Sequence, residues 1–232
     1  ANSAVSNFPD GPVVEKGGQA YVLRADVART VYTCAPASGA VCSGALTTFG
    51  AGNGAVTEAL LGAADAAERE LLINWAIGLD MDNENDPDSS VPDTSEMRPS
   101  VHGDVVHTQP VAIDYASDPT DPDVVVFYGG NDGALRAING NRNAPADAAS
   151  GQHNGKLPGE EFWAFLPPQF YARIKRLRDN GPAVEFPASG PTEGQGSAGA
   201  PKPYGFDGPI TAFDGTVGGV ARRFIYAGMR RG

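Results

Sequence analysis

The sequence predicts a mainly β protein built from short strands and tight turns. Gly 30 and Pro 19 together make up about a fifth of the 232 residues, against an ordinary share of roughly 12%. Hydrophobic residues make up 41% of the chain, which is enough for a buried core. In the second half of the chain, short apolar runs alternate with turn-forming residues. These observations argue against a helical bundle and against a disordered chain.

Two short apolar segments near the N-terminus are strand candidates, Ala20–Leu23 and Arg29–Thr33. The two cysteines of the chain, Cys34 and Cys42, follow them, and proline and glycine lie between the cysteines. This spacing predicts a disulfide that closes a short loop. A disulfide implies an oxidising compartment, such as the periplasm, the cell surface or the medium. The alternative, a zinc site, would need further ligands from elsewhere in the chain.

The first predicted helix begins after Asp65 and ends at Gly78. Asp65 is placed as the N-cap, and Glu68, three residues later, completes a capping box. Apolar side chains recur at helical spacing on one face of this segment: Leu71, Leu72 and Trp75. We therefore expect this face to pack against the core.

A second helix is predicted to begin at Pro167–Pro168, because a proline in the first turn loses no helical hydrogen bond. One side of it carries the apolar residues Phe170, Tyr171, Ile174 and Leu177. The rest of its surface carries the basic residues Arg173, Lys175, Arg176 and Arg178. We interpret these basic residues as a solvated face, with docking of an acidic partner as the alternative.

The remaining pattern predicts six short strands: Gln109–Tyr115, Val124–Tyr128, Ala134–Asn139, Glu161–Leu166, Ile210–Phe213 and Arg223–Tyr226. The segment Gly129–Gly133 joins two of them in a tight hairpin, because Gly, Asn and Asp tolerate a positive φ. Trp163, on a predicted strand, is expected to anchor the core, as is Trp75. Residues 141–158 and 180–208 have little apolar periodicity and are predicted to be inserted loops.

A weak internal repeat suggests how the strands are arranged. Pro110–Ile113 followed by Phe127–Gly130 is similar to Pro209–Ala212 followed by Ile225–Gly228, at offsets of 99 and 98 residues. Repeated strand–loop–strand units are typical of radial sheets, and chance similarity in a glycine-rich chain is the alternative. The predicted fold class is therefore a mainly β, partial β-propeller with helical and loop insertions. Residues 1–100 are expected to form a lead-in segment, and residues 101–232 the first blades.

The charge of the chain limits its partners. Lys and Arg number 17 and Asp and Glu number 28, so the formal net charge is −11. Such a surface repels nucleic acid and anionic lipid, and we expect neither as a partner. The sequence contains no apolar stretch long enough for a membrane helix, so we expect no membrane insertion.

The strongest chemical signal is an acidic segment between Asp80 and Glu96 that contains seven acidic residues and no Lys or Arg. Carboxylates at every second position resemble the first half of a calcium loop, because Ca²⁺ takes six to eight oxygen ligands. The candidate ligands are Asp80, Asp82, Glu84, Asp86 and Asp88. Asn85 and Val91 stand where an EF-hand requires Gly and Glu, so the match is incomplete. A solvated acidic loop, Mg²⁺ or a transition metal are the alternatives.

Motifs of catalysis are absent from the sequence. It contains no nucleophile elbow, phosphate-binding loop or dinucleotide fingerprint. His102 and His107 would point to opposite faces of a regular strand, and His153 lies in a polar, glycine-rich segment. We therefore expect no catalytic triad and no zinc site at these histidines.

Five stretches of the chain form a recognisable series: Glu15–Gly18, Arg29–Cys34, Arg98–Pro110 (RPSVHGDVVHTQP), Gly130–Asn139 (GNDGALRAIN) and Gly159–Pro167 (GEEFWAFLP). Taken in this order, they resemble the start of the C-terminal propeller of the PilY/PilC family of type IV pilus biogenesis adhesins. A single strand–Asn-Asp-Gly–strand turn also recurs in quinoprotein-like propellers, so the order of the stretches carries the resemblance.

The resemblance implies a calcium-responsive, non-enzymatic protein at the pilus tip, cell surface or outer membrane. Such a protein supports pilus assembly, twitching and adhesion. The implied partners are pilus tip or minor pilin proteins, the remaining propeller blades, and a host or surface receptor. The better-known calcium loop of the family lies farther toward the C-terminus, so the assignment of calcium to Asp80–Asp88 rests on spacing alone. A propeller needs about four to eight blades, so this sequence is expected to be a fragment.

Two other functions remain open. The Asn131-Asp132-Gly133 hairpin and the strand of Trp163 also occur in quinone-dependent dehydrogenases of the propeller type. That class characteristically has adjacent cysteines, and Cys34 and Cys42 are not adjacent. The second alternative is a secreted propeller that only scaffolds other proteins.

Overall fold

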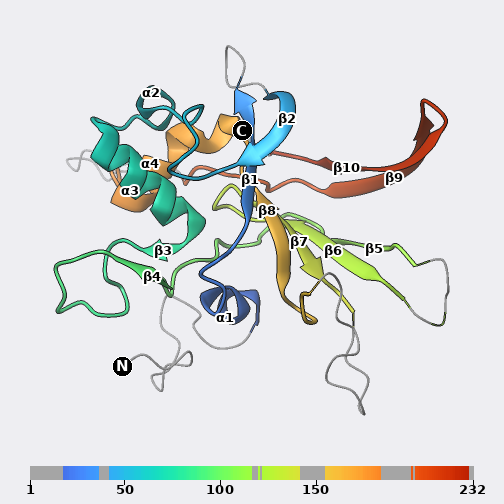
Figure 1. Ribbon diagram of the computed structural model, residues 1–232, viewed down its shortest axis with the longest axis horizontal. Helices are drawn as coiled ribbons and strands as arrows, with labels where there is room; N and C mark the ends of the chain where they lie inside the picture. The colour runs from blue at the N-terminus through green and yellow to red at the C-terminus, as the bar shows by residue number, and fades with distance from the viewer. Residues whose placement is uncertain are drawn as a thin grey trace, which may run out of the picture.

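The structure is a computed structural model that describes residues 18–36, 42–116, 120, 122–141, 155–183, 200 and 202–229 (Figure 1). Of the described residues, 33% lie in strands and 20% in helices, which confirms the prediction of a mainly β protein. Most of the predicted loops 141–158 and 180–208 lies outside the described residues, as does His153.

A mixed sheet of six strands forms the centre of the molecule (Figure 1). Its strand order is β2-β1-β8-β7-β6-β5. The strands are β1 (Val31–Pro36), β2 (Cys42–Thr48), β5 (Val111–Asp114), β6 (Val124–Gly129), β7 (Leu135–Asn139) and β8 (Glu161–Phe165). Strands β5 to β8 form an antiparallel meander, and β1 adds to β8 in parallel. Strands from the first hundred residues therefore belong to the same sheet as the meander.

The predicted hairpin at Gly129–Gly133 joins β6 to β7. Gly133 adopts a φ of 88°, a left-handed conformation that glycine takes without strain. The same residue lies against the Phe170 ring, where a Cβ would approach ring carbons to 2.1 Å. The glycine is therefore required twice, by the turn and by the packing.

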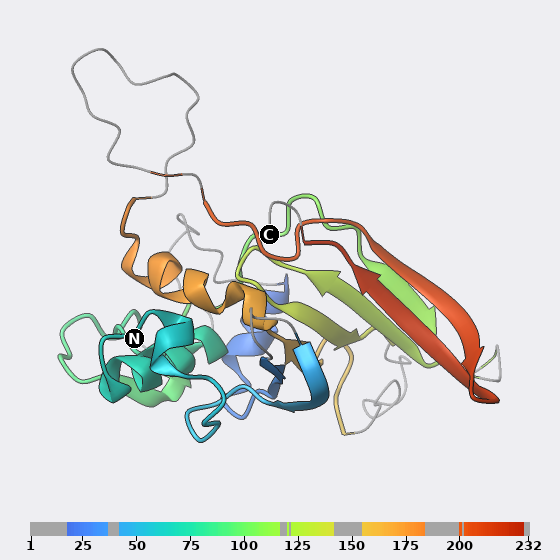
Figure 2. The ribbon, with the colours of Figure 1, turned by 90° about the horizontal axis from the view of Figure 1, so that it is seen from above.

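A helical layer covers one face of the sheet (Figure 2). It consists of α2 (Glu58–Leu61), α3 (Ala66–Ile77), the 3-10 turn η1 (Pro168–Phe170) and α4 (Tyr171–Asp179). Leu72 and Ile73 on α3 share one core with Ala164 of β8. The predicted caps of α3 are confirmed, because Asp65 accepts a hydrogen bond from the Glu68 amide at 2.8 Å and the helix ends at Gly78.

The second predicted helix begins as a 3-10 turn at Pro168 and becomes α-helical at Tyr171. Its predicted apolar side is confirmed, because Phe170, Tyr171 and Ile174 are buried in the core of the helical layer. Both tryptophans also pack as expected. Trp75 lies at the edge of this core, and Trp163 packs against Phe127 with ring centroids 6.0 Å apart on the other side of the sheet.

The prediction of a strand at Ala20–Leu23 is wrong, because these residues lie in helix α1 (Gly18–Arg24). A four-residue apolar run fits a strand or a helical turn equally well, and packing decides between them. Leu23 is buried against Met97 and Val101. Met97 belongs to β4 (Asp93–Met97), which pairs with β3 (Leu79–Asp80) beside the acidic segment.

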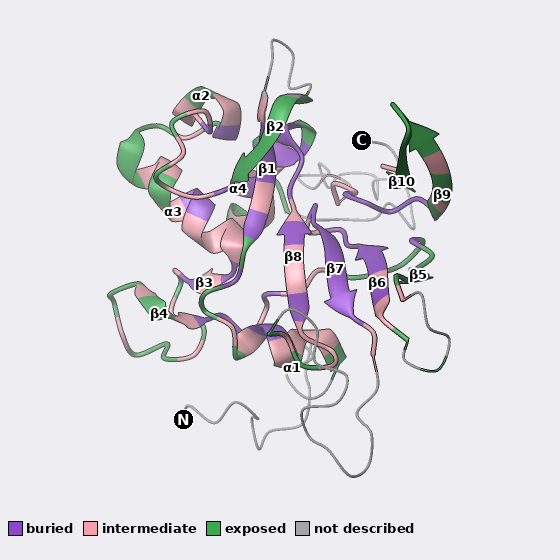
Figure 3. Ribbon diagram, turned by 45° about the vertical axis from the view of Figure 1, so that its right-hand side comes forward, coloured by how far each residue is buried: buried purple, intermediate pink, exposed green. Residues whose placement is uncertain are grey.

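The last two predicted strands form one long hairpin, β9 (Ile210–Val217) and β10 (Val220–Ala227). Gly218 and Gly219 make its turn with φ values of 60° and 80°. The hairpin packs flat on the face of the meander opposite the helices (Figure 2). Figure 3 shows that β6 and β7 are largely buried and that β8 is partly buried, whereas most of the hairpin is exposed.

The internal repeat corresponds to the two hairpins β5–β6 and β9–β10. Val111 pairs with Phe127, whereas the matching Ile210 pairs with Ala227, two residues after the match of Phe127, so the two hairpins differ in register. The matched residues contact the same apolar clusters: Val111 and Ile210 in one, Ile113 with Ala212 and Phe127 with Ile225 in another. Equivalent faces of the hairpins therefore point toward each other, whereas blades related by rotation present opposite faces. The described residues contain no closed barrel or propeller, so the partial propeller remains a proposal.

The predicted disulfide is present between Cys34 and Cys42, with Cα atoms 5.4 Å apart. It links β1 to the start of β2, and Cys34 is 2% exposed. Because the closed loop is short, the chain-entropy relation gives a stabilisation of about 2 to 3 kcal/mol.

We expect the double substitution of Cys34 and Cys42 by serine to lower the free energy of unfolding by about 2 to 3 kcal/mol. Urea titration of both proteins, followed by tryptophan fluorescence, measures this difference. Wild-type protein treated with a reductant should lose the same amount. An unchanged midpoint after reduction would mean that the bond does not constrain the unfolded chain.

Candidate functional site

Residues 98–110, the longest stretch of the family resemblance, form a loop that joins β4 to β5 and lies along the meander. Arg98 at its start is buried, with its guanidinium 4.0 Å from the centre of the Trp75 ring. Asp104 accepts a hydrogen bond from the Asn131 side chain at 2.9 Å, and the Gly103 amide donates to Asp132 at 3.1 Å. The loop is thus held to the β6–β7 turn.

A chain of buried charges lies behind this loop. The Arg136 side chain on β7 is fully buried and forms an ion pair with Asp132 in the turn. On its other side, the Arg136 Nε lies 3.4 Å from the Glu161 carboxylate of β8. Glu161 also accepts two hydrogen bonds from Arg29, at 2.6 and 3.2 Å. Arg29 in turn donates to the Ile77 carbonyl at 2.8 Å, so the network joins the sheet to the end of α3.

Burial and charge shift the ionisation of these groups. Burial alone would raise the pKa of Asp132, but the Arg136 guanidinium outweighs it and holds that pKa well below its usual value. Burial alone would lower the pKa of Arg136, but its carboxylate neighbours raise it. Both groups are therefore charged at neutral pH. They act as a fixed ion pair rather than as a proton donor and acceptor.

His102 and Tyr128 form a neutral pair next to this network. The His102 Nε2 atom lies 2.7 Å from the Tyr128 hydroxyl. Burial, assisted by the positive charge of Arg136, lowers the pKa of His102 to about 4. Burial also raises the pKa of the Tyr128 hydroxyl. At neutral pH, therefore, the hydrogen bond joins an uncharged imidazole and an un-ionised hydroxyl, and the tautomer of His102 sets which of the two donates.

The first two candidate calcium ligands already have partners in the chain. Asp80 is 1% exposed and accepts hydrogen bonds from the amides of Glu84 and Asn85, at 2.7 and 2.9 Å. Asp82 forms an ion pair with Arg178 of α4. Asp80 therefore shapes the acidic loop, and Asp82 fixes that loop to the helical layer.

The other three candidates do not converge with them. Glu84 accepts a hydrogen bond from the Ser100 hydroxyl at 2.7 Å and lies 3.8 Å from Arg98. Asp86 and Asp88 are exposed. Within the described part of the chain, no group of three His, Cys, Asp or Glu side chains is placed to hold a metal ion.

A cleft of about 310 Å³ does lie beside this loop. It contains two of the five predicted residues, Asp80 and Asp86, and adds two carboxylates from β4, Asp93 and Glu96. Asn85 reaches across the cleft, with its side-chain amide 3.1 Å from Glu96. The spacing argument missed Asp93 and Glu96 because it counted only the alternating run, although both belong to the same acidic segment. Binding of Ca²⁺ would require these carboxylates to move together.

If Ca²⁺ binds here, a free concentration about 100 times its Kd should stabilise the protein by about 2.7 kcal/mol. We expect millimolar Ca²⁺ to raise the melting temperature and to slow proteolysis between Asp80 and Glu96. Chelation by EGTA should reverse both effects, and a double variant, Asp93→Asn with Glu96→Gln, should abolish them. Equal melting curves with Ca²⁺ and with EGTA would exclude this site.

The basic residues of α4 have partners within the chain. Arg173 and Arg176 donate to the carbonyls of Tyr204 and Ala200, at 2.8 and 2.7 Å. Lys175 contacts Glu68 and Asp179. The basic side chains of α4 are thus engaged in contacts within the chain. These contacts do not favour the alternative that the helix docks an acidic partner.

His107 pairs with Asp207, one hundred residues later in the chain. The His107 Nδ1 lies 2.7 Å from the Asp207 carboxylate, which is 1% exposed. A cleft of about 660 Å³ adjoins the pair, between the loop and the start of β9. Sequence reasoning did not find this pair, because no local pattern connects two residues that lie one hundred positions apart. In the structure it anchors the hairpin β9–β10 to the loop 98–110.

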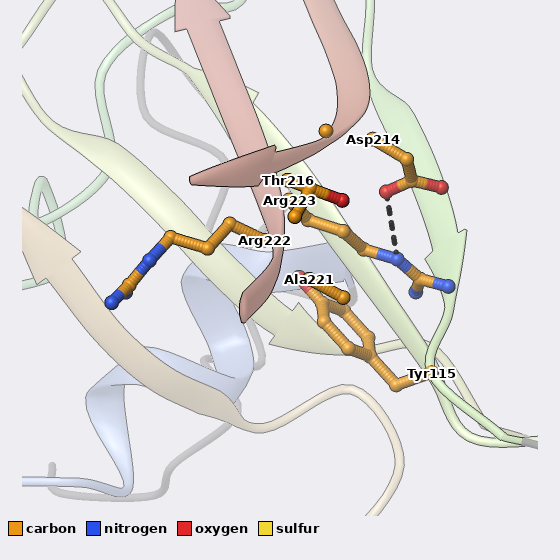
Figure 4. A pocket seen from close by; sticks show the side chains of 7 residues that line it. Tyr115, Asp214, Thr216, Ala221, Arg222 and Arg223 are labelled. Carbon is orange, nitrogen blue, oxygen red and sulfur yellow. Dashed lines mark ion pairs between the residues drawn. The ribbon is translucent and has the colours of Figure 1, made fainter. Parts of the chain in front are cut away.

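A further groove, of about 620 Å³, lies where the end of β5 meets the hairpin (Figure 4). The Arg223 guanidinium stacks over the Tyr115 ring at 4.6 Å and pairs with Asp214 at 3.0 Å. Arg223 also donates to the Asp114 carbonyl. Arg223 thus holds the hairpin against the edge strand. Arg222 also lines the groove, and its side chain extends to the opposite side of the strand from Arg223 (Figure 4).

Comparison of the chain with known protein families, curated proteins and solved structures finds no match. Among the described residues, none of the helices has the length and apolar character needed to cross a bilayer. Function must therefore be inferred from the contacts described above.

Proposed function

We propose that this chain is a non-enzymatic module of an exported type IV pilus assembly factor and tip-associated adhesin, similar to the PilY/PilC family. It supports pilus extension, twitching and surface attachment, and Ca²⁺ orders its acidic segment. Its partners are pilus tip or minor pilin proteins, further blades of the same propeller, and a receptor on a surface.

The arrangement of β5 to β8 gives this proposal its main support. A four-stranded antiparallel meander is the unit from which β-propellers are built. A second hairpin lies on its face, as the start of another sheet would. The outer face of that hairpin carries exposed apolar residues, including Phe213 and Tyr226. A further sheet packed there would cover them.

The charged groups give a second line of support. Arg29, Asp132, Arg136 and Glu161 form one buried network that joins strands, turn and helix. Arg178 and Arg223 fix the acidic loop and the hairpin. Groups held in this way stabilise a scaffold, which suits a binding module better than an enzyme.

The packing of the hairpin sets a condition on the proposal. The hairpins β5–β6 and β9–β10 meet through equivalent faces. In a regular ring of blades, β9–β10 would have to present its other face to the meander. A structure of the chain with further blades would decide whether this happens.

Deletion of the gene in a piliated bacterium tests the proposed role. We expect fewer surface pili in electron micrographs and smaller twitching zones, both restored by the wild-type gene. Normal pili and twitching after deletion would favour the secreted scaffold instead. Quinone-dependent alcohol oxidation by the purified protein would assign it to the dehydrogenases.

A further inference from the structure

The hairpin β9–β10 presents an apolar face to solvent. Side chains alternate along each strand, and Ala212 and Ile225 point toward the meander. The alternate residues therefore form the outer face: Thr211, Phe213, Val217, Val220, Arg222, Phe224 and Tyr226. Phe213 and Tyr226 are 59% and 60% exposed, and Val217 and Val220 are 53% and 54% exposed. A contiguous apolar patch of this kind marks an interaction surface.

The charge of the outer face is opposite to that of the whole chain. It carries one arginine, Arg222, and no Asp or Glu, although the chain has a net charge of −11. Among the described residues, Arg222 has no hydrogen bond or ion pair, whereas its neighbour Arg223 has both. Figure 4 shows the two guanidinium groups on opposite sides of the strand. Aromatic residues with an arginine are the composition typical of binding hot spots.

Strand β10 also has a free edge. Within the described residues, β9 and β10 pair only with each other. Their counterparts in the repeat differ, because β5 is an edge strand and β6 is paired on both sides, by β5 and β7. The free edge of β10 thus corresponds to the position that β7 occupies beside β6. It is eight residues long and contains no proline, so its unpaired backbone groups can accept another strand.

We infer that β10 binds an extended segment of a partner protein as an added antiparallel strand. Apolar side chains of this segment cover Phe224 and Tyr226, and a carboxylate on the same face pairs with Arg222. The inference concerns the same outer face that a further sheet would cover under the proposed function, but it does not depend on a role in pili.

A second copy of the chain is a poorer occupant. Antiparallel pairing of two full β10 strands about a two-fold axis would centre the joint sheet between Arg223 and Phe224, and Arg222 and Arg223 of both copies would lie close to that centre. Like charges at close cross-strand positions destabilise a sheet. The negative charge of each copy adds to this repulsion.

Two synthetic nine-residue peptides test the inference. Both carry Val at alternate positions with Thr between them, and the central Val is replaced by Glu in one peptide and by Lys in the other, so that the charge lies on the same face as the remaining Val side chains. Fluorescence anisotropy with the full chain should show that the Glu peptide binds about ten times more tightly, although the net charge of the protein favours the Lys peptide. Arg222→Glu should reverse this preference, and Arg222→Gln should remove it. Tyr226→Ser should weaken binding of the Glu peptide about tenfold. Val91→Ser, a matched change at a residue that is 69% exposed on the acidic loop, should leave it unchanged.

Hydrogen exchange locates the added strand. Amides of β10 that do not pair with β9 should become protected when the Glu peptide is present, and the outward amides of β9 should not. Equal affinity for both peptides, tighter binding of the Lys peptide, or protection on β9 would overturn the inference. A concentration-dependent dimer that Tyr226→Ser dissolves would assign the face to a second copy. Circular dichroism confirms that each variant is folded, and none of these readouts involves pili.

Discussion

Replacing Arg136 by methionine is expected to lower the free energy of unfolding by about 3 kcal/mol. Its guanidinium is fully buried and forms an ion pair with Asp132 and lies near Glu161. Methionine fills a similar volume, but it leaves the Asp132 carboxylate without its cation. Glu161 retains Arg29, so most of the loss should arise at Asp132. Urea titration of the two proteins measures the difference.

A matched control is available on the surface of the same molecule. Arg178 forms ion pairs with Asp82 and Asp179, and its side chain is 20% exposed, so Arg178→Met should cost less than about 1 kcal/mol. A second variant, Asp132→Asn, should restore part of the stability of Arg136→Met, because it removes the unpaired charge. If Arg136→Met unfolds at the same urea concentration as Arg178→Met, the buried network contributes no more to the free energy of unfolding than the surface ion pair does.

Stability is expected to fall by about 3 kcal/mol between pH 6.5 and pH 4 because of His102. Burial lowers its folded-state pKa to about 4, whereas the unfolded chain retains the usual 6.5. Between these values the unfolded state binds a proton that the folded state does not, so acid favours unfolding. The contribution is fully present above pH 6.5 and is lost as the pH falls to about 4. Urea titrations across this range measure the slope.

The variant His102→Gln separates this effect from those of the carboxylates. Glutamine can still accept the hydrogen bond of the Tyr128 hydroxyl, but it does not titrate. Its stability should therefore change little between pH 6.5 and pH 4.5. The lowered pKa of Asp132 acts in more acidic solution, below the usual carboxylate value of 3.8. A wild-type stability that is flat down to pH 4.5 would mean that His102 is solvated in the folded protein.

Local sequence was sufficient to predict elements that are stabilised by neighbouring residues. The caps of α3 at Asp65 and Gly78 act within one turn of the helix. The turn before β7 depends on Gly133, and the disulfide joins cysteines only eight positions apart. Each of these structures follows from residues that are close in the chain, so tertiary packing did not need to be known.

The candidate calcium site was harder to predict from sequence. Alternating carboxylates suggested that Asp80, Asp82 and Glu84 would converge on one ion. In the structure, Asp82 contacts Arg178, which lies 96 residues away, and Glu84 lies near Arg98. A carboxylate binds whichever cation or amide the fold brings near it, and spacing along the chain does not reveal these partners.

The sequence by itself determined the mainly β class, the helix caps, the β6–β7 turn, the disulfide and the negative charge, because each depends on composition or on adjacent residues. Only the tertiary structure decided that Arg29 meets Glu161 and that His107 meets Asp207, across 132 and 100 residues. It also decided which face of β9–β10 is covered. Both faces carry apolar side chains, and only the position of the meander distinguishes them.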